Sequence, residues 1–136
     1  MKTLSTKLFY ALIIDRNKED HSILRNTINR MIPNILVESL FDEEETIAYF
    51  ENCKKSPDLV FLDMNLHFIF LKFILHTIRK TKLLSRIPVA IVNASLDLKN
   101  REELKAFGVN EFYLDLKRKI ELRLISYDLK HKWLVY

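Results

Sequence analysis

The chain has 136 residues and a mass of 16.3 kDa, the size of one domain with one core. Hydrophobic residues make up 49% and charged residues 29%, which excludes a disordered chain, and one cysteine, Cys53, excludes a disulfide scaffold. Gly108 is the only glycine, so the glycine-rich loops with which many enzymes hold nucleotide phosphates are absent. The net charge is +4, and residues 117–136, with six Lys or Arg and two Asp or Glu, carry all of this excess.

Five short apolar runs alternate with longer segments of helical period, an order typical of a parallel sheet covered by helices on both faces. Strands that are buried on both faces read as continuous apolar runs. Glu38 and Ser39 interrupt the second run, so we expect it at an edge of the sheet. The predicted strands are Phe9–Ile14, Ile35–Leu40, Leu59–Leu62, Val89–Val92 and Phe112–Leu114.

Apolar residues at helical spacing predict a helix after each strand. In the third predicted helix, the apolar residues form one buried stripe. In the second predicted helix, we expect Ile47, Phe50 and Cys53 to face inward. Glu19 and Asp20 place negative charge in the first turn of the first helix, where the helix dipole favours it. Gly108 would end the fourth helix in a left-handed conformation. The predicted helices are Glu19–Met31, Asp42–Lys54, Phe70–Thr81, Leu98–Phe107 and Arg118–Trp133, and the predicted stripe of the third is Leu71, Ile74, Leu75 and Ile78.

The last helix has more apolar residues than one buried stripe can hold. One set can face the sheet, and the other would remain outside among basic residues as a surface for a partner. Two alternatives stay open: the tail Leu134–Tyr136 covers the second set, or the basic residues form an ordinary solvated face.

Polar residues follow the predicted strands at their carboxyl ends, where open α/β sheets form their functional crevice. An acidic residue that ends an interior strand is costly unless it is solvated, paired or bound to a metal. Several such acids together suggest a cation site or an aspartyl nucleophile, although each alone can also be a helix N-cap. The residues at these ends are Asp15, Arg16, Asp63, Asn65, Asn93 and Asp115.

The sequence resembles the receiver domain of bacterial two-component response regulators in three segments, Ala11–Asp20, Pro57–Leu66 and Ile87–Val92. The most specific part of the resemblance is the segment around Asp63. The resemblance covers nearly the whole chain. It implies a flavodoxin-like α/β fold, a doubly wound five-stranded parallel sheet in the order 2-1-3-4-5 flanked by five helices. Because no second segment for an output domain is present, residues 1–136 are similar to single-domain, chemotaxis-regulator-like members.

The resemblance also assigns residue roles. Asp63 matches the aspartate that accepts a phosphoryl group from a histidine kinase or phosphotransfer protein. Asp15 matches the first acid of the pair after the first strand, and Asn65 the position whose backbone carbonyl helps to hold Mg²⁺. Phe112 matches the aromatic residue that changes orientation when the domain switches. The implied metal ligands are therefore Asp15, Asp63 and Asn65.

Other positions depart from the family pattern. Arg16 replaces the second acid, and Asn93 replaces the Thr or Ser that binds the phosphoryl group. Asp115 replaces a lysine. The predicted pocket therefore contains the acids Asp15 and Asp115. An apolar segment, His67–Leu71, replaces a polar turn. Phosphoryl transfer to a carboxylate needs charge neutralisation and hydrogen-bond donors around the phosphoryl oxygens, so these changes weaken the case for Mg²⁺ binding and phosphorylation. We hypothesise that the Arg16 guanidinium pairs with Asp63 or Asp115 in place of the metal.

These observations favour an atypical response regulator that is not an enzyme and acts by protein-protein interaction, with impaired phosphorylation at Asp63. The alternatives are a fully working phospho-receiver and a small flavodoxin-like enzyme or carrier. The third is disfavoured because the loop after the first strand is charged and lacks glycine. We expect a cytoplasmic protein without direct nucleic-acid or membrane contact, with a downstream partner on the last helix. A homodimer could form through that helix or the start of the third.

Overall fold

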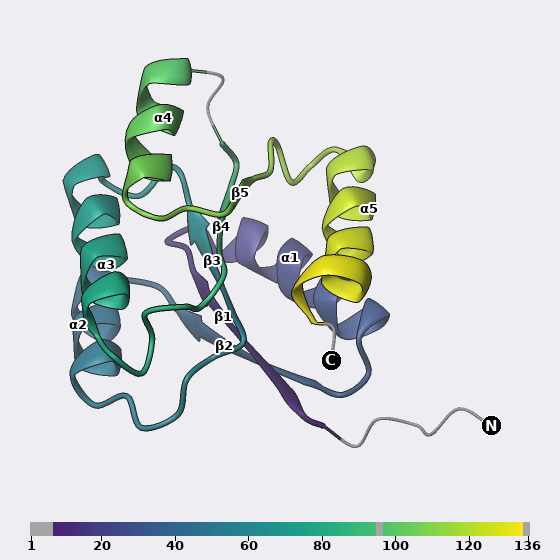
Figure 1. Ribbon diagram of the computed structural model, residues 1–136. Coiled ribbons are helices and arrows are strands. Elements are labelled where there is room, and N and C mark those ends of the chain that lie inside the picture. Colours follow the sequence, from purple (N-terminus) through teal and green to yellow (C-terminus); the bar gives the residue numbers. More distant parts are fainter. Residues whose placement is uncertain (1–6, 95–96, 135–136) are drawn as a thin grey trace.

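The structure, a computed structural model, describes residues 7–94 and 97–134, and shows one parallel sheet between two layers of helices (Figure 1). The strands are hydrogen-bonded in the order β2-β1-β3-β4-β5. This confirms the predicted doubly wound five-stranded sheet in the order 2-1-3-4-5, with β2 at an edge. The strands are β1 (Phe9–Ile14), β2 (Ile35–Leu40), β3 (Leu59–Asp63), β4 (Val89–Val92) and β5 (Glu111–Phe112).

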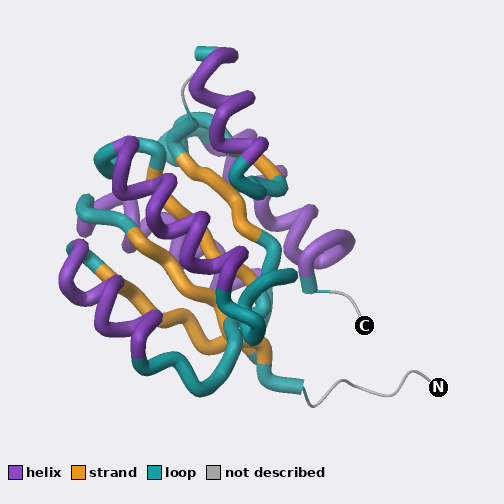
Figure 2. The backbone as a smooth tube through the Cα atoms, turned by 60° about the vertical axis from the view of Figure 1, so that its left-hand side comes forward, coloured by secondary structure: helices purple, strands orange, loops and turns teal. Residues whose placement is uncertain are grey.

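Helices α1 and α5 cover one face of the sheet, and α2, α3 and α4 cover the other (Figures 1 and 2). The chain continues from α5 directly into a π-helical segment, η1, that ends at Trp133. Among the described residues, no helix is long and apolar enough to cross a membrane. The helices are α1 (Lys18–Met31), α2 (Glu43–Glu51), α3 (Phe68–Lys80), α4 (Leu98–Ala106), α5 (Lys119–Asp128) and η1 (Leu129–Trp133).

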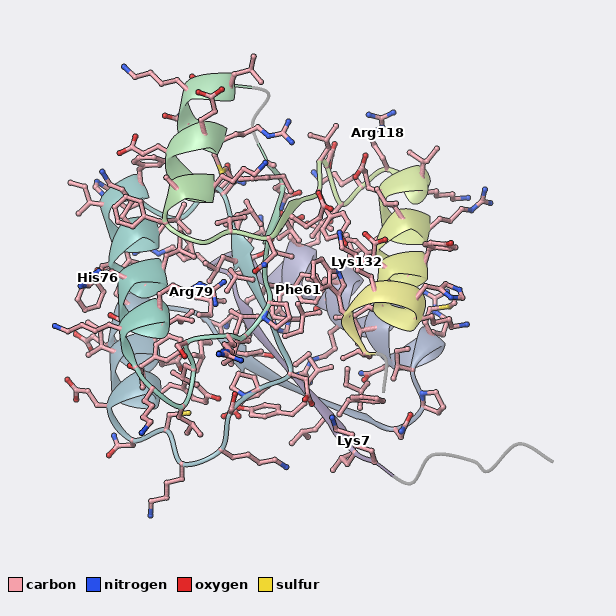
Figure 3. All side chains as sticks on the ribbon, viewed as in Figure 1. Lys7, Phe61, His76, Arg79, Arg118 and Lys132 are labelled. Carbon is pink, nitrogen blue, oxygen red and sulfur yellow. The ribbon has the colours of Figure 1, made fainter. Side chains whose placement is uncertain are left out.

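The sheet separates two apolar cores, one under each helical layer. All residues of β1, β3 and β4 are buried, as expected of interior strands with both faces covered. Figure 3 shows Phe61 of β3 in the middle of the molecule, whereas His76 lies on the outer side of α3. The stripe predicted for the third helix is confirmed, because its four members are all buried: Leu71, Ile74, Leu75 and Ile78.

Two details of the sequence prediction were wrong. Of the three residues predicted to face inward from the second helix, Phe50 and Cys53 do pack against the core, but Ile47 is 37% exposed. The buried residue of α2 is Thr46, and Tyr49 also contacts the core. Strand β5 begins one residue before the predicted start and is regular for only two residues. The pairing continues irregularly, because Tyr113 N–H donates to the Ile91 carbonyl at 2.7 Å.

The single glycine lies where the sequence predicted it. Gly108 follows the last residues of α4 with a φ of 104°, a left-handed conformation that side chains with a Cβ rarely adopt. Its carbonyl accepts a hydrogen bond of 2.5 Å from Arg79 Nη2 of α3. Gly108 therefore both ends α4 and connects it to the neighbouring helix.

Candidate functional site

The parallel register brings the predicted acids to the same edge of the sheet. Ile14 of β1 pairs with Leu62 of β3, so Asp15 and Asp63, the next residues in each chain segment, lie side by side. Asp63 in turn pairs with Val92 of β4, which places Asn93 beside it. Both carboxylates are buried, with Asp15 fully enclosed and Asp63 2% exposed.

Asp15 has one satisfied and one unsatisfied oxygen. Its Oδ1 accepts a hydrogen bond from the Asn17 N–H at 2.8 Å, whereas Oδ2 is buried and receives no hydrogen bond from any N–H or O–H donor among the described residues. A hydrogen bond to the neighbouring Asp63 carboxyl forms only when one of the two acids is protonated, and together with burial this contributes to the raised pKa of Asp15. Burial, together with the negative charges of Asp63 and Asp20, raises the pKa of Asp15 to about 8. A buried carboxylate oxygen of this kind is stabilised by a proton or by a cation.

Asp63 is held by two amide donors. Its Oδ1 accepts from the Asn65 backbone N–H at 3.1 Å and from the Asn93 side-chain Nδ2 at 3.4 Å. The Asn65 side chain is exposed at the start of the loop that leads to α3. The carboxylate is thus fixed from the loop on one side and from the end of β4 on the other.

Asn93 connects three parts of the fold. Besides Asp63, its Nδ2 contacts Asp20 Oδ2 of α1 at 3.2 Å, and its Oδ1 accepts from the Leu116 N–H in the loop before α5 at 3.0 Å. Its φ is 54°, a left-handed conformation that asparagine tolerates better than most residues. The side chain therefore lies across Asp63 as a fixed bridge rather than as a free donor.

Asp20 is a site residue that the sequence prediction missed. It lies in the first turn of α1 and is buried, and burial followed by the nearby charge of Asp63 raises its pKa. We interpreted it only as a charge favoured by the helix dipole. A usable signal was present, because Asp20 lies at the same helical spacing as the buried Leu24 and Ile28 and so on the inner face.

Above these acids lies a small pocket of about 300 Å³, lined by Asp20, Asn65, Asn93, Ala94, Asp115 and Lys117. Asp115 is exposed at its rim and accepts a hydrogen bond from the Lys117 N–H at 2.9 Å. Lys117, which the sequence analysis did not single out, places a positive charge at the pocket two residues after Asp115. The attraction of Lys117 opposes the rise in the pKa of Asp20.

The hypothesis for Arg16 is wrong. Its side chain is exposed, and it forms no ion pair with any residue that the structure describes. The physical reason is the turn after β1: the Asn17 N–H folds back to Asp15, and Arg16 at the apex points to solvent. Phe112 of β5 is half-buried against the core under α3 and α4, with the Arg101 guanidinium 4.9 Å from the centre of its ring.

The carboxylates at this edge of the sheet suit a magnesium ion that keeps several of its water ligands. In the described part of the chain, no three His, Cys, Asp or Glu side chains are close enough to hold a metal. Mg²⁺, however, commonly binds through one or two carboxylates and keeps several waters. Asp15, with its unpartnered Oδ2, and Asp63 provide two carboxylates, and the exposed Arg16 does not block them.

Comparison with solved structures identifies the fold as that of response regulator receiver domains. The phosphorylated cyanobacterial phytochrome response regulator RcpA is 22% identical, with a TM-score of 0.78 over 94% of this chain and 95% of its own. The signal receiver domain of a DNA-binding response regulator from Colwellia psychrerythraea 34H is 21% identical, with a TM-score of 0.74 over 90% and 99%.

A third similar structure holds a metal. It is the receiver domain of the sensor histidine kinase PA1611 from Pseudomonas aeruginosa PAO1, with a magnesium ion in its active-site cleft. It is 16% identical, with a TM-score of 0.71 over 94% of this chain and 98% of its own. No protein-family model and no curated protein matches the sequence. The chain thus has the receiver fold, at a sequence identity of 16 to 22% with these structures.

Proposed function

We propose that this chain is a receiver module of two-component signalling that works by binding partner proteins and accepts a phosphoryl group at Asp63 only poorly. The observation that carries the proposal is the bridge formed by Asn93. Its amide contacts Asp63 and Asp20, at the position where the family resemblance places a hydroxyl that binds the phosphoryl group. The receiver fold supports the signalling role.

The reaction in question moves a phosphoryl group from a histidine of a kinase or phosphotransfer protein. The N–P bond of the phosphohistidine breaks, its electron pair returns to the histidine nitrogen, and a bond forms between Asp63 Oδ and phosphorus. Three carboxyl groups, those of Asp15, Asp20 and Asp63, gather where the charged phosphoryl group must enter, and burial, together with their proximity, raises the pKa of Asp15 and of Asp20. The burial of Asp63 and the fixed Asn93 side chain further restrict this approach.

Mg²⁺, when bound, would neutralise the phosphoryl oxygens. Asp15, Asp63 and the Asn65 backbone carbonyl are the groups that would hold it. Lys117 at the rim supplies positive charge near the entering group in place of the lysine that Asp115 replaces. These features support a second candidate, a fully working phospho-receiver, and the unpartnered Asp15 oxygen is the observation in its favour.

The two candidates differ in the extent of phosphorylation. We would incubate the protein with acetyl phosphate and Mg²⁺ and follow the intact mass for an adduct of about 80 Da, with Asp63→Asn as the negative control. The proposal predicts that only a small fraction of the protein carries the adduct after a long incubation. Complete conversion of the wild type within minutes, absent in Asp63→Asn, would establish the working receiver instead.

We place the partner surface of this cytoplasmic module on α5. Part of its second apolar set is indeed exposed: Ile120 and Tyr127 are each 63% exposed, and Leu124 is 46% exposed. Leu134 is buried in the core, while Val135 and Tyr136 lie outside the described residues. At the start of α3, Ile69 is also exposed, so both faces considered for a homodimer remain available.

A further inference from the structure

A second cavity lies away from the acidic pocket, in the seam between α1 and α5. Thr27 of α1 and Ser126 of α5 are the small, buried side chains at its base. Both hydroxyls donate to carbonyls of their own helices, at 2.8 Å to Ile23 and 2.9 Å to Leu122. Two small side chains across a helix pair leave space above them, and here the space is a groove of about 610 Å³. Figure 1 shows these two helices on the same face of the sheet.

All the charged side chains that line this groove are positive. Arg30 contributes from the end of α1, and Lys119, Arg123 and Lys130 contribute from α5 and η1, while no Asp or Glu lines it. None of these four side chains forms an ion pair with any residue in the described ranges 7–94 and 97–134. Four positive charges without an ion-pair partner among the described residues thus line one groove.

The centre of the groove is apolar. Met31 and Leu122 are half-buried there, and the exposed Tyr127 ring lies 4.4 Å from the ring of His131, measured between centroids. The lining residues of α5 recur at helical spacing from Lys119 to Tyr127, about 12 Å at the rise of an α-helix, and Lys130 and His131 of η1 extend this stripe. A small anion would use only one end of such a stripe.

We propose that the α1/α5 groove binds an acidic amphipathic helix of a partner protein. An apolar stripe on that helix would pack on Met31, Leu122 and Tyr127, and its flanking carboxylates would face Arg30 and Arg123. Helix-in-groove recognition uses this arrangement of apolar anchors, and complementary charge sets orientation and partner choice. The inference rests on the proposed function, since it narrows the partner surface of α5 to the side that faces α1, where Tyr127 is the one of its three exposed apolar residues that lines the groove. It needs no phosphoryl group at Asp63.

The test measures binding of a synthetic peptide of about four helical turns, with Leu and Phe on one stripe and Glu beside it, by fluorescence anisotropy. We expect a Kd on the order of 10 µM for the wild type. Arg123→Glu and Lys130→Glu should each weaken binding at least about tenfold. Lys99→Glu makes the same charge change on exposed α4 and should alter the Kd less than about twofold. Circular dichroism would confirm that each variant is folded.

Three results would overturn the proposal: equal weakening by Lys99→Glu, equal binding of a scrambled peptide of the same composition, or binding to anionic phosphatidylserine vesicles but not to the peptide. Asp63→Asn should bind the peptide as the wild type does. Because the mass assay tests Asp63 separately, a failure of peptide binding and a failure of the phosphorylation proposal are distinguishable.

Discussion

At the scale of single residues, Asn93 makes more contacts at the acidic edge of the sheet than its neighbours Asp15 and Asp63 do. One side chain contacts a strand carboxylate, a helix carboxylate and a loop N–H, so it cannot turn toward an entering group without losing contacts that fix its position. Its left-handed backbone adds a second constraint, because β-branched residues are strained there. A threonine at this position would not be a neutral replacement.

We therefore expect Asn93→Ser to become phosphorylated at Asp63 faster than the wild type does. Serine supplies a hydroxyl that can donate to a phosphoryl oxygen, and it is too short to keep the contacts to Asp20 and Leu116. In the acetyl phosphate assay the rate of adduct formation should rise at least about tenfold, which corresponds to about 1.4 kcal/mol of barrier. Asn93→Ala removes the bridge without adding a hydroxyl and should show a smaller gain. Rates unchanged in both variants would contradict a role for Asn93 as the obstacle.

Sequence reasoning located Asp15 and Asp63 because several acids directly follow buried apolar strands and because the segments around them resemble receiver domains. It could not locate Lys117, whose position depends on the path of an irregular loop. It misplaced Arg16 because a turn, rather than the strand direction, sets where that side chain points. Local hydrogen bonds at the ends of strands were the part of the site that the sequence could not resolve.

At the scale of elements, the α3 and α4 helices are joined through one arginine. Arg79 donates from Nη1 to the Ile87 carbonyl at 2.6 Å and from Nη2 to the Gly108 carbonyl and to Asn110 Oδ1 at 3.0 Å. A Cβ added at Gly108 would lie 2.5 Å from Arg79 Nε. The one glycine of the chain is thus required both by its own φ and by its neighbour.

Gly108→Ala should lower the free energy of unfolding by at least about 1–2 kcal/mol, the cost of a left-handed conformation for an L-residue. Urea unfolding measures this change. The control is Lys105→Ala in the exposed last turn of α4, for which we expect a change within about 0.5 kcal/mol. Equal stability of the two variants would show that the turn relaxes at no cost.

The elements themselves were predictable where periodicity is strong. The inner stripe of α3 and the apolar runs of β1, β3 and β4 follow directly from residue spacing. The inner face of α2 was predicted only in part: Phe50 packs against the core as expected, whereas Thr46 is buried in the place of Ile47. Strand β5 is short, and its pairing is completed by irregular contacts that have no sequence period.

At the scale of the whole molecule, the acidic edge acts on stability as well as on chemistry. The folded state encloses Asp15 beside two other acids, whereas the unfolded chain leaves it in water. Because the pKa of Asp15 is raised to about 8 in the folded state, that state binds a proton more tightly than the unfolded state does. Stability contributed by this group is therefore present at low pH and is lost as the pH rises toward 8.

Asp15→Asn should remove this dependence. As the pH rises from about 4 to about 8, the free energy of unfolding of the variant should increase relative to that of the wild type. The slope of this difference should be up to about 1.4 kcal/mol per pH unit, because one proton is involved. The lowered pKa of His21 acts in the opposite direction and the raised pKa of Asp20 in the same direction, and both groups are present in both proteins, so the comparison between the two proteins reports the removal of the Asp15 carboxyl. Urea unfolding without Mg²⁺ across this range measures it, with Glu102→Gln on exposed α4 as the control. Parallel pH profiles for the wild type and Asp15→Asn would mean that the buried carboxyl stays ionised, because only an ionised group would leave the profile unchanged in this range.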